Sequence, residues 1–264
     1  MPTTAPVGHW FEAMADHMGP AYLRYSFTKG TAQETAFLRE VLDLGPGSRV
    51  LDVGCGPGRH VHAFAAAGFS AHGIDISQTF IDAAIEAGVA GATFERADAR
   101  ALSVDREFDL AMSLCQGGFG LLGREEDGAA DADVVRAMAR AVRPGGRVVV
   151  SAFSAYFAVR FLERTDTFDA ATGVNHERSE LRNAAGEGAE FDLWTSCFTP
   201  RELRLIMSAA GLKVEHLWSV TPGAYARQEP DLDHPEFLVV ARRPADEARL
   251  GPTRPDEARA LAPR

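Results

Sequence analysis

Lysine is scarce in this chain: Lys29 and Lys213 are the only two among its 264 residues. The arginines are scattered, acidic residues outnumber basic ones by 37 to 27, and the formal net charge is −10. Affinity for a nucleic acid comes largely from Lys and Arg side chains that neutralise phosphates. The composition therefore argues against DNA or RNA as a partner.

Long apolar runs are also missing, and cysteines are few. No uninterrupted apolar stretch approaches the ~20 residues that a membrane span needs. The first residues lack the basic, apolar and small-residue segments of a secretory leader. Cys55, Cys115 and Cys197 are widely spaced and show no metal-ligand pairing. We therefore expect a cytoplasmic protein with reduced thiols, no metal and no membrane partner.

The most informative segment is 49–60, where hydrophobic residues run directly into three glycines. Gly54, Gly56 and Gly58 are spaced two apart, and an apolar helix pattern begins at Val61. Glycine is needed where the backbone takes a positive φ or lies against a ligand. The N–H groups at the start of the helix point toward the turn. The segment predicts a strand, a turn and a helix that form a nucleotide-sized pocket.

Two acidic residues bear on which nucleotide this pocket binds. Asp75 closes the apolar stretch 70–76, where a carboxylate can accept both hydroxyl hydrogens of a ribose. Both NAD and S-adenosylmethionine (SAM) offer that ribose. Asp52 precedes the glycines, where an anion is unfavourable beside a pyrophosphate but favourable beside a sulfonium and an ammonium group. The glycine spacing G-x-G-x-G, in place of G-x-G-x-x-G, also disfavours NAD.

Residues 51–58, Leu-Asp-Val-Gly-Cys-Gly-Pro-Gly, resemble motif I of the class I SAM-dependent methyltransferases. Later motifs of that family follow in the family's order. They are the ribose-binding second strand at 73–77, the third strand at 94–99, the fourth strand at 108–116, and the turn and fifth strand at 143–150. Together the motifs cover roughly residues 35–153. A lone glycine motif is a weak signal, whereas ordered motifs are a specific one, so the resemblance implies a SAM site.

The resemblance also implies which residues hold the cofactor. It places Asp98 at the adenine amino group. Cys115 and Gln116 directly follow the fourth strand, at the end where ligands bind in open α/β sheets, so we expect a backbone contact between Cys115 and the cofactor. Cys55 is explained most simply as a small residue that fits a tight turn. The predicted cofactor-binding residues are Asp52, Gly54, Cys55, Gly56, Gly58, Asp75, Ile76, Asp98, Ala99, Leu114, Cys115, Gln116, Tyr22, Tyr25 and Thr28.

Strand patterns that alternate with helix patterns indicate a parallel sheet with right-handed crossovers. We predict an α/β, doubly wound domain over residues 31–245. The resemblance implies a mostly parallel seven-stranded sheet with an antiparallel last strand, and strand patterns at 213–220 and 236–242 supply its end. We expect the stretch 246–264, with prolines among charges, to be disordered.

Two segments lie outside the motifs. Residues 1–30 are aromatic, and the resemblance implies a helical lid over the cofactor; the alternative is that these aromatics only dock the segment on the core. Residues 154–198 form an insertion after strand five, with a helix pattern at 154–165 and strand patterns at 172–183 and 189–198. In small-molecule methyltransferases such insertions cover the active site or make subunit contacts. We therefore expect a substrate cap and a possible homo-oligomer.

The chemistry demands few catalytic residues. Transfer of a methyl group from SAM, which leaves S-adenosylhomocysteine (SAH), is an in-line displacement that proximity and exclusion of water promote. A general base is needed only where the acceptor must lose a proton, and histidine is the default base at neutral pH. His60, at the start of the motif I helix, and His176, in the insertion, are the candidates. The structural alternatives are packing near the cofactor for His60 and a solvated hairpin face for His176.

The acceptor class follows by exclusion. Residues 114–120 lack the Asn/Asp-Pro-Pro-aromatic signature of enzymes that methylate base amines, and no second domain offers a grip on a protein. We expect methyl transfer to an oxygen or nitrogen of a small molecule held between the N-terminal segment and the insertion. Two alternatives stay open: a SAM-binding enzyme with another reaction on this scaffold, and a non-catalytic SAM-binding module.

Overall fold

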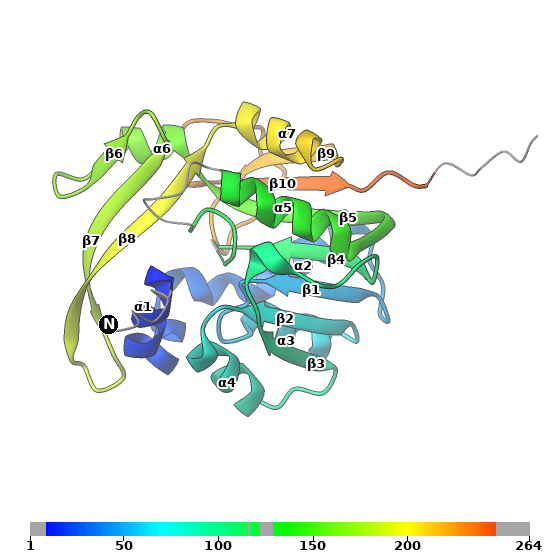
Figure 1. The fold of residues 1–264 in the computed structure, drawn as a ribbon, viewed down its shortest axis with the longest axis horizontal. Helices are drawn as coiled ribbons and strands as arrows, with labels where there is room; N and C mark the ends of the chain where they lie inside the picture. The colour runs from blue at the N-terminus through cyan, green and yellow to red at the C-terminus, as the bar shows by residue number, and fades with distance from the viewer. Residues whose placement is uncertain (1–8, 116, 122–128, 247–264) are drawn as a thin grey trace, which may run out of the picture.

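The computed structural model describes residues 9–115, 117–121 and 129–246. Its centre is a twisted sheet in which the strands lie in the order β3-β2-β1-β4-β5, continued by β10 and then β9 at the edge (Figure 1). These strands are β1 (Arg49–Val53), β2 (Ser70–Asp75), β3 (Ala92–Arg96), β4 (Phe108–Ser113), β5 (Val142–Ser154), β9 (Lys213–Val220) and β10 (Glu236–Arg242). The five strands from β3 to β5 pair in parallel, whereas β10 is antiparallel to both of its neighbours. The predicted fold class is confirmed.

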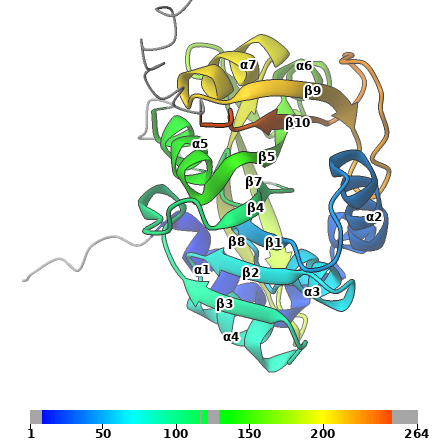
Figure 2. The same cartoon turned by 90° about the vertical axis from the view of Figure 1, so that its right-hand side faces the viewer.

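Helices cover both faces of this sheet (Figure 2). One face carries α2, α3 and α4, and Leu38 and Phe64 are buried there. The other face carries α5 and α7, and Met138 and Met207 are buried there. The bounds are α2 (Thr31–Leu42), α3 (Arg59–Ala66), α4 (Gln78–Glu86), α5 (Ala129–Ala141) and α7 (Pro200–Ala209). Because both faces are covered, the central strands are rich in buried apolar residues, as at 110–112 in β4 and 148–150 in β5.

The segment between β5 and α7 forms a separate layer. It consists of α6 (Ala155–Arg160), β6 (Thr167–Asp169), β7 (Val174–Arg182) and β8 (Gly188–Phe198). The β7–β8 hairpin is antiparallel, and β8 joins the main sheet only where Phe153 pairs with Cys197 and Ser154 with Phe198. The two strands predicted for this segment are present. The three-residue β6 was not predicted, and the helix ends at Arg160, earlier than expected.

The chain before α2 lies across the carboxyl ends of the parallel strands. It contains α1 (Trp10–Met18) and two 3₁₀ helices, η1 (Gly19–Arg24) and η2 (Ser26–Gly30). Figure 1 shows α1 between these strand ends and the β7–β8 hairpin. Met14 and Met18 of α1 are buried in one cluster with Phe80 of α4 and Leu181 of β7. The N-terminal segment and the insertion therefore meet above the sheet.

Two other expectations concern the ends of the chain and the membrane. Residues 247–264, which hold nearly all of the predicted disordered tail, lie outside the described residues. Within the described part of the chain, no helix combines the length and the apolar character needed to cross a membrane.

Gly54, just after β1, yields a test of how tightly the first turn packs. Its φ is +74°, and an added Cβ would lie 1.9 Å from the carbonyl carbon of Gly117. We expect Gly54→Ala to lower the free energy of unfolding by about 2 kcal/mol more than Gly145→Ala, because overpacking adds to the backbone strain. Gly145 is a matched control, since its φ is +81° and an added Cβ would meet no described atom within 4 Å. Urea denaturation measures both, and equal losses would contradict the close packing.

Candidate active site

A narrow cleft opens at the carboxyl ends of β1, β2 and β3. Several of the predicted cofactor residues line it together, although they come from separate motifs: Gly54, Asp75, Ile76, Asp98 and Ala99. Gly117 and Gly118, which follow β4, form part of its wall, and His9 and Phe11 of the N-terminal segment border it. The structure thus brings the motif residues to one site at the sheet edge where ligands bind in open α/β folds.

The glycine turn after β1 forms the base of this cleft. The backbone N–H groups of Gly54 and Cys55 donate to the carbonyl oxygen of Ile74, at 2.8 and 2.9 Å. Gly58 takes a φ of +80° at the start of α3, which a side chain would disfavour. The Cys55 side chain is buried in the core beneath the turn. The turn is therefore fixed to β2, with Cys55 and Gly58 packed in the interior and Gly54 lining the cleft.

Asp75 ends β2 and is bonded to the glycine turn. Its two carboxyl oxygens accept hydrogen bonds from the backbone N–H groups of Gly56 and Ser77, both at 2.8 Å. Burial raises the pKa of Asp75 to about 6, and these hydrogen bonds act against the rise. Each carboxylate oxygen accepts more than one hydrogen bond. Asp75 can therefore hold the turn and still accept hydroxyl hydrogens of a ribose.

Asp52 carries the observation that fits a cationic cofactor. Its side chain is buried, and its Oδ2 has no hydrogen-bond partner among the residues that the structure describes. Burial raises its pKa to about 7; Asp75 raises the pKa as well, while Arg59 lowers it. A buried carboxyl oxygen without a donor is costly. Asp52 does not line the cleft itself, so its contact with the sulfonium or ammonium group of SAM stays a prediction, with which this unpartnered oxygen is consistent.

Asp98 is placed as predicted at the end of β3, but it already has a partner. It caps the 3₁₀ helix η3 (Ala99–Ala101), and its carboxylate accepts from the Arg100 guanidinium at 2.7 Å. Hydrogen bonds from Arg100 hold the pKa of Asp98 below its usual range. A contact between Asp98 and the adenine amino group thus stays a prediction. In such a contact, the Asp98 carboxylate would accept from both the adenine and Arg100.

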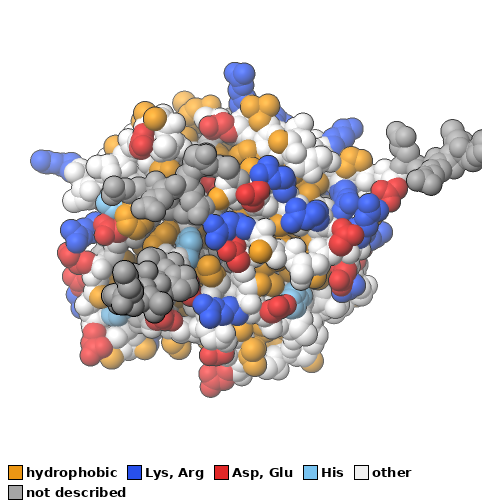
Figure 3. Space-filling view, viewed as in Figure 1, with side chains coloured by type: hydrophobic (Ala, Val, Ile, Leu, Met, Phe, Trp, Pro, Cys, Tyr) orange, Lys and Arg blue, Asp and Glu red, His pale blue; other side chains and the backbone are white. Residues whose placement is uncertain are grey.

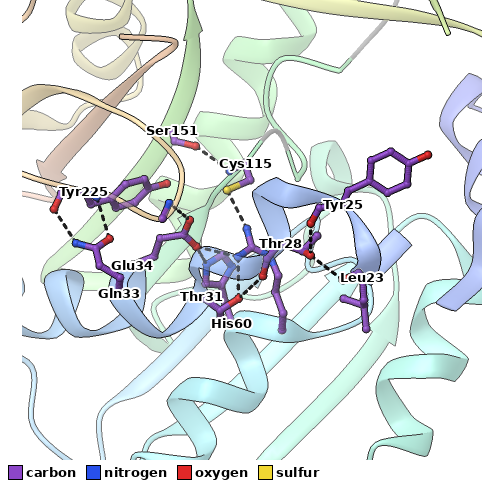
Figure 4. A network of polar contacts seen from close by, with 12 residues as sticks. Leu23, Tyr25, Thr28, Thr31, Gln33, Glu34, His60, Cys115, Ser151 and Tyr225 are labelled. Atoms are coloured by element: carbon purple, nitrogen blue, oxygen red, sulfur yellow. Dashed lines mark hydrogen bonds and ion pairs between the residues drawn. The ribbon is translucent and has the colours of Figure 1, made fainter. Parts of the chain in front are cut away.

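Behind the turn, a buried polar network ties helix α2 to the site (Figure 4). Glu34 of α2 is fully buried, and its Oε2 accepts from the Arg59 guanidinium at 2.8 Å and lies 2.7 Å from His60 Nε2. Its Oε1 accepts from the backbone N–H of Gly223 at 2.8 Å. A second guanidinium nitrogen of Arg59 lies 2.8 Å from Cys115 Sγ. One carboxylate therefore links α2, α3 and the loop before β10, and Arg59 extends the link to the end of β4.

The electrostatics of this network bear on the predicted base His60. Burial alone would raise the pKa of Glu34, but the hydrogen bond and charge of His60, together with Arg59, outweigh it and lower that pKa. Burial lowers the pKa of His60, and Arg59 lowers it further, although Glu34 opposes both. His60 is thus a buried partner of Glu34. It lines neither the cofactor cleft nor the second cavity, which lies between α1, α6 and the β7–β8 hairpin. Its catalytic role stays a prediction that this geometry does not support.

His176 lies on the outer face of the β7–β8 hairpin. Its Nε2 is 2.8 Å from Asp192 Oδ1, and its ring stacks on Trp194 with centroids 5.0 Å apart. Its neighbours Asn175 and Glu177 line this second cavity, between α1, α6 and the hairpin, and side chains alternate along a strand. His176 therefore faces away from that cavity, and a role as base stays a prediction without a contact to support it.

A second cavity, of about 460 Å³, adjoins the cofactor cleft. Phe11 and Leu121 line both spaces. The cavity lies between α1, α6 and the β7–β8 hairpin, and it is mostly apolar. Tyr22, Tyr25 and Cys115, all predicted for the cofactor site, line this second cavity. Cys115 has a φ of +51°, a conformation that costs energy outside glycine and that functional sites often contain.

Two of the remaining predicted residues pack or hydrogen-bond within the protein, and one lies outside the described residues. Thr28 is buried, and its hydroxyl donates to the carbonyl oxygens of Leu23 and Tyr25 at 2.9 and 2.7 Å, which holds the turn between η1 and η2. Leu114 is buried in the core. Gln116 lies outside the described residues.

Sequence reasoning missed Glu34 and Arg59. Arg59 directly follows Gly58, so its position beside the turn was a usable signal. Its partner Glu34 lies 25 residues earlier, on a helix whose pattern shows only an acidic residue in the first turn. The N-terminal segment was expected over the cofactor, but His9 and Phe11 were not among its predicted cofactor residues, although both border the cleft.

Comparison with known proteins agrees with this geometry. A family model described as a methyltransferase domain matches residues 50–146. The ubiquinone biosynthesis O-methyltransferase of Ralstonia nicotianae is 30% identical over 209 residues, covering 75% of this chain and 77% of that protein. The CcbJ methyltransferase of Streptomyces caelestis has a TM-score of 0.72 at 20% identity, covering 90% of this chain and 99% of that one. SAM-bound CalS10, an amino pentose methyltransferase of Micromonospora echinaspora, has a TM-score of 0.59 at 21% identity, covering 92% and 100%.

The fold and the site define a nucleotide-binding α/β enzyme whose cleft suits a cationic nucleoside. The chain belongs to the class I SAM-dependent methyltransferases. SAM is its cofactor.

The raised pKa of Asp75 gives a pH-dependent test of the ribose site. Below about pH 6 the Asp75 carboxyl group becomes protonated and loses acceptor capacity, so SAM affinity should fall as the pH drops from 7 to 5. We expect Asp75→Asn to weaken SAM binding by about 10- to 100-fold at pH 7.5 and to remove the inflection near pH 6. Isothermal titration calorimetry measures both, and unchanged affinity in the variant would refute the ribose role.

The buried network predicts a large effect for a single neutralised charge. We expect Glu34→Gln to lower the free energy of unfolding by about 3 kcal/mol, because Arg59 then keeps a buried charge without its partner. Glu40→Gln on the same helix is the control: its side chain is 72% exposed and pairs with Arg227, so we expect a loss of less than about 1 kcal/mol. Denaturant titration compares them, and a small loss for Glu34→Gln would contradict the network's importance.

Proposed function

We propose that this methyltransferase acts on an oxygen or nitrogen atom of a small-molecule acceptor bound in the 460 Å³ cavity. The observation that carries the proposal is that this cavity adjoins the cofactor cleft through Phe11 and Leu121. Its volume and mostly apolar lining are typical of small-molecule sites. A non-catalytic module does not require this second cavity, whereas a SAM enzyme with another reaction is separated from a methyltransferase by its products.

In this proposal, the chain's own residues bind and orient the two reactants. Asp75 accepts from the ribose, and Asp52 faces the positive end of the cofactor. SAM supplies a methyl group on a positively charged sulfur, which is a good leaving group. Tyr22 extends from the glycine turn to the acceptor cavity: an added Cβ on Gly56 would lie 3.8 Å from its ring.

We propose that proximity and exclusion of water supply most of the rate acceleration. The apolar lining includes Trp10, Phe11 and Met14 of α1, so the N-terminal segment serves as a lid and residues 154–198 as a cap. Burial raises the pKa of Tyr22 well above its usual range, so this phenol stays protonated and can hydrogen-bond the acceptor without acting as a base. When SAM is bound, its methyl group would replace a hydrogen of the acceptor, whose proton would leave to solvent or to a nearby polar group.

We also propose that the protein has no nucleic-acid partner, forms a homo-oligomer and is located in the cytoplasm. Lys and Arg side chains are interspersed with Asp and Glu on the face in Figure 3, which supports the absence of a nucleic-acid partner. Tyr156, Val159 and Phe161 of the cap expose 42%, 56% and 53% of their surface. Such side chains support a homo-oligomer formed through residues 154–198. The low cysteine content supports the cytoplasm as its location.

Product analysis tests the proposed reaction. We expect the enzyme to convert SAM to SAH in the presence of a panel of catechols, phenols and aromatic amines. Mass spectrometry should find an acceptor with one hydrogen replaced by a methyl group. The relative named an O-methyltransferase makes the hydroxyl-bearing compounds the first to test. Asp75→Asn is the control with a damaged cofactor site.

Three results would contradict methyl transfer to a small molecule. Tight SAM binding without any methylated product would support a non-catalytic module. Consumption of SAM without transfer of its methyl group would support a different reaction on this scaffold. Equal turnover by the Asp75→Asn variant would place the reaction outside the described cleft.

A further inference from the structure

The β7–β8 hairpin presents two chemically different faces. Asn175, Glu177, Ser179 and Leu181 alternate along β7 and line the acceptor cavity. Arg178, on the outer face, lies 3.6 Å from Glu190 across the hairpin. The basic side chain of this stretch of β7 is thus turned away from the cavity, whereas the acidic Glu177 is turned into it.

The charges that line the cavity have one sign. Glu163, Asp166 and Glu177 are the charged side chains among its described lining, and that lining contains no Lys, Arg or His. The neighbouring Arg160 does not line the cavity: its guanidinium pairs with Asp233 at 2.5 Å and lies over the ring of Phe161. A partly enclosed space lined by one sign of charge concentrates ligands of the opposite sign and rejects ligands of the same sign. Carboxylate- or phosphate-bearing acceptors are therefore disfavoured.

The uncharged polar atoms of the hairpin agree with this polarity. Asn175 Oδ1 is buried and has no hydrogen-bond partner among the described residues. The Ser179 hydroxyl donates to the Glu177 carboxylate, which orients that side chain on the inner face. A buried carbonyl oxygen without a donor, two residues from an acidic side chain, matches a ligand that brings N–H groups and a positive charge.

We infer that the acceptor is an amphipathic amine, whose apolar body fills the cavity and whose ammonium group is recognised by Glu177 and Asn175. The inference rests on the proposed methyl transfer to a small molecule and names its substrate class. The ammonium is bound at the cap side, by the hairpin, whereas Tyr22 and Cys115 line the cavity beside the cofactor turn. Glu177 is thus a specificity residue whose task is to select the acceptor's charge.

Three matched probes test this selection in the SAH-saturated enzyme. Tryptamine, tryptophol and indole-3-acetate share an indole body and end in an ammonium, a hydroxyl and a carboxylate group. Calorimetry should show that tryptamine binds about tenfold or more tightly than tryptophol, and that indole-3-acetate binds most weakly. Glu177→Gln should remove the preference for tryptamine and leave tryptophol affinity unchanged. Asn175→Leu should weaken tryptamine binding by a smaller factor.

Glu180→Gln is the matched control, because Glu180 is on the same strand but points to the outer face, where it pairs with Arg182. It should retain the full preference for tryptamine, which separates recognition at Glu177 from the general attraction of an acidic protein. SAH affinity in each variant reports that the protein is folded. The inference is overturned if SAH binds normally but tryptamine has no advantage, if no probe binds, or if Glu177→Gln keeps the preference. Failure of the wild-type protein to bind SAH would instead refute the proposed function.

Discussion

The rest of the site depends on the ion pair and hydrogen bonds that the buried carboxylate of Glu34 makes. A charge this deep is tolerable only because Arg59, His60 and the backbone N–H of Gly223 satisfy it. Through these partners, α2 is fixed to the start of α3 and to the loop before β10. Arg59 lies directly after the last glycine of the turn, so the same pairing sets the orientation of the backbone that faces the cofactor.

The acceptor cavity is a product of the fold as a whole. Its walls come from α1, near the start of the chain, and from the α6 and β7–β8 segment inserted after β5. Neither segment encloses a space alone, and their apolar side chains meet above the carboxyl ends of the strands. The cofactor cleft is built on the main sheet, where motif residues fix it. Acceptor selection is built on the added layers, so the two tasks are structurally separate.

The sequence allowed the sheet and the cofactor cleft to be predicted, because their signals are local. The predicted strands 213–220 and 236–242 coincide with β9 and β10, and Asp75 ends β2 at the cleft as expected. The partners of Glu34 could not be predicted, since the ion pair spans 25 residues and no periodicity marks it. The outward direction of His176 was also hidden, because residues 172–183 alternate too weakly to show which side chains face inward.

A crystal structure of the enzyme with SAH bound tests the central claim most directly. The account requires the ribose hydroxyls on the Asp75 carboxylate and the adenine beside Asp98. It also requires the sulfur to point past Tyr22 into the cavity shared by α1 and the β7–β8 hairpin. A nucleoside bound in another cleft, or a sulfur directed away from that cavity, would contradict the assignment of the two sites.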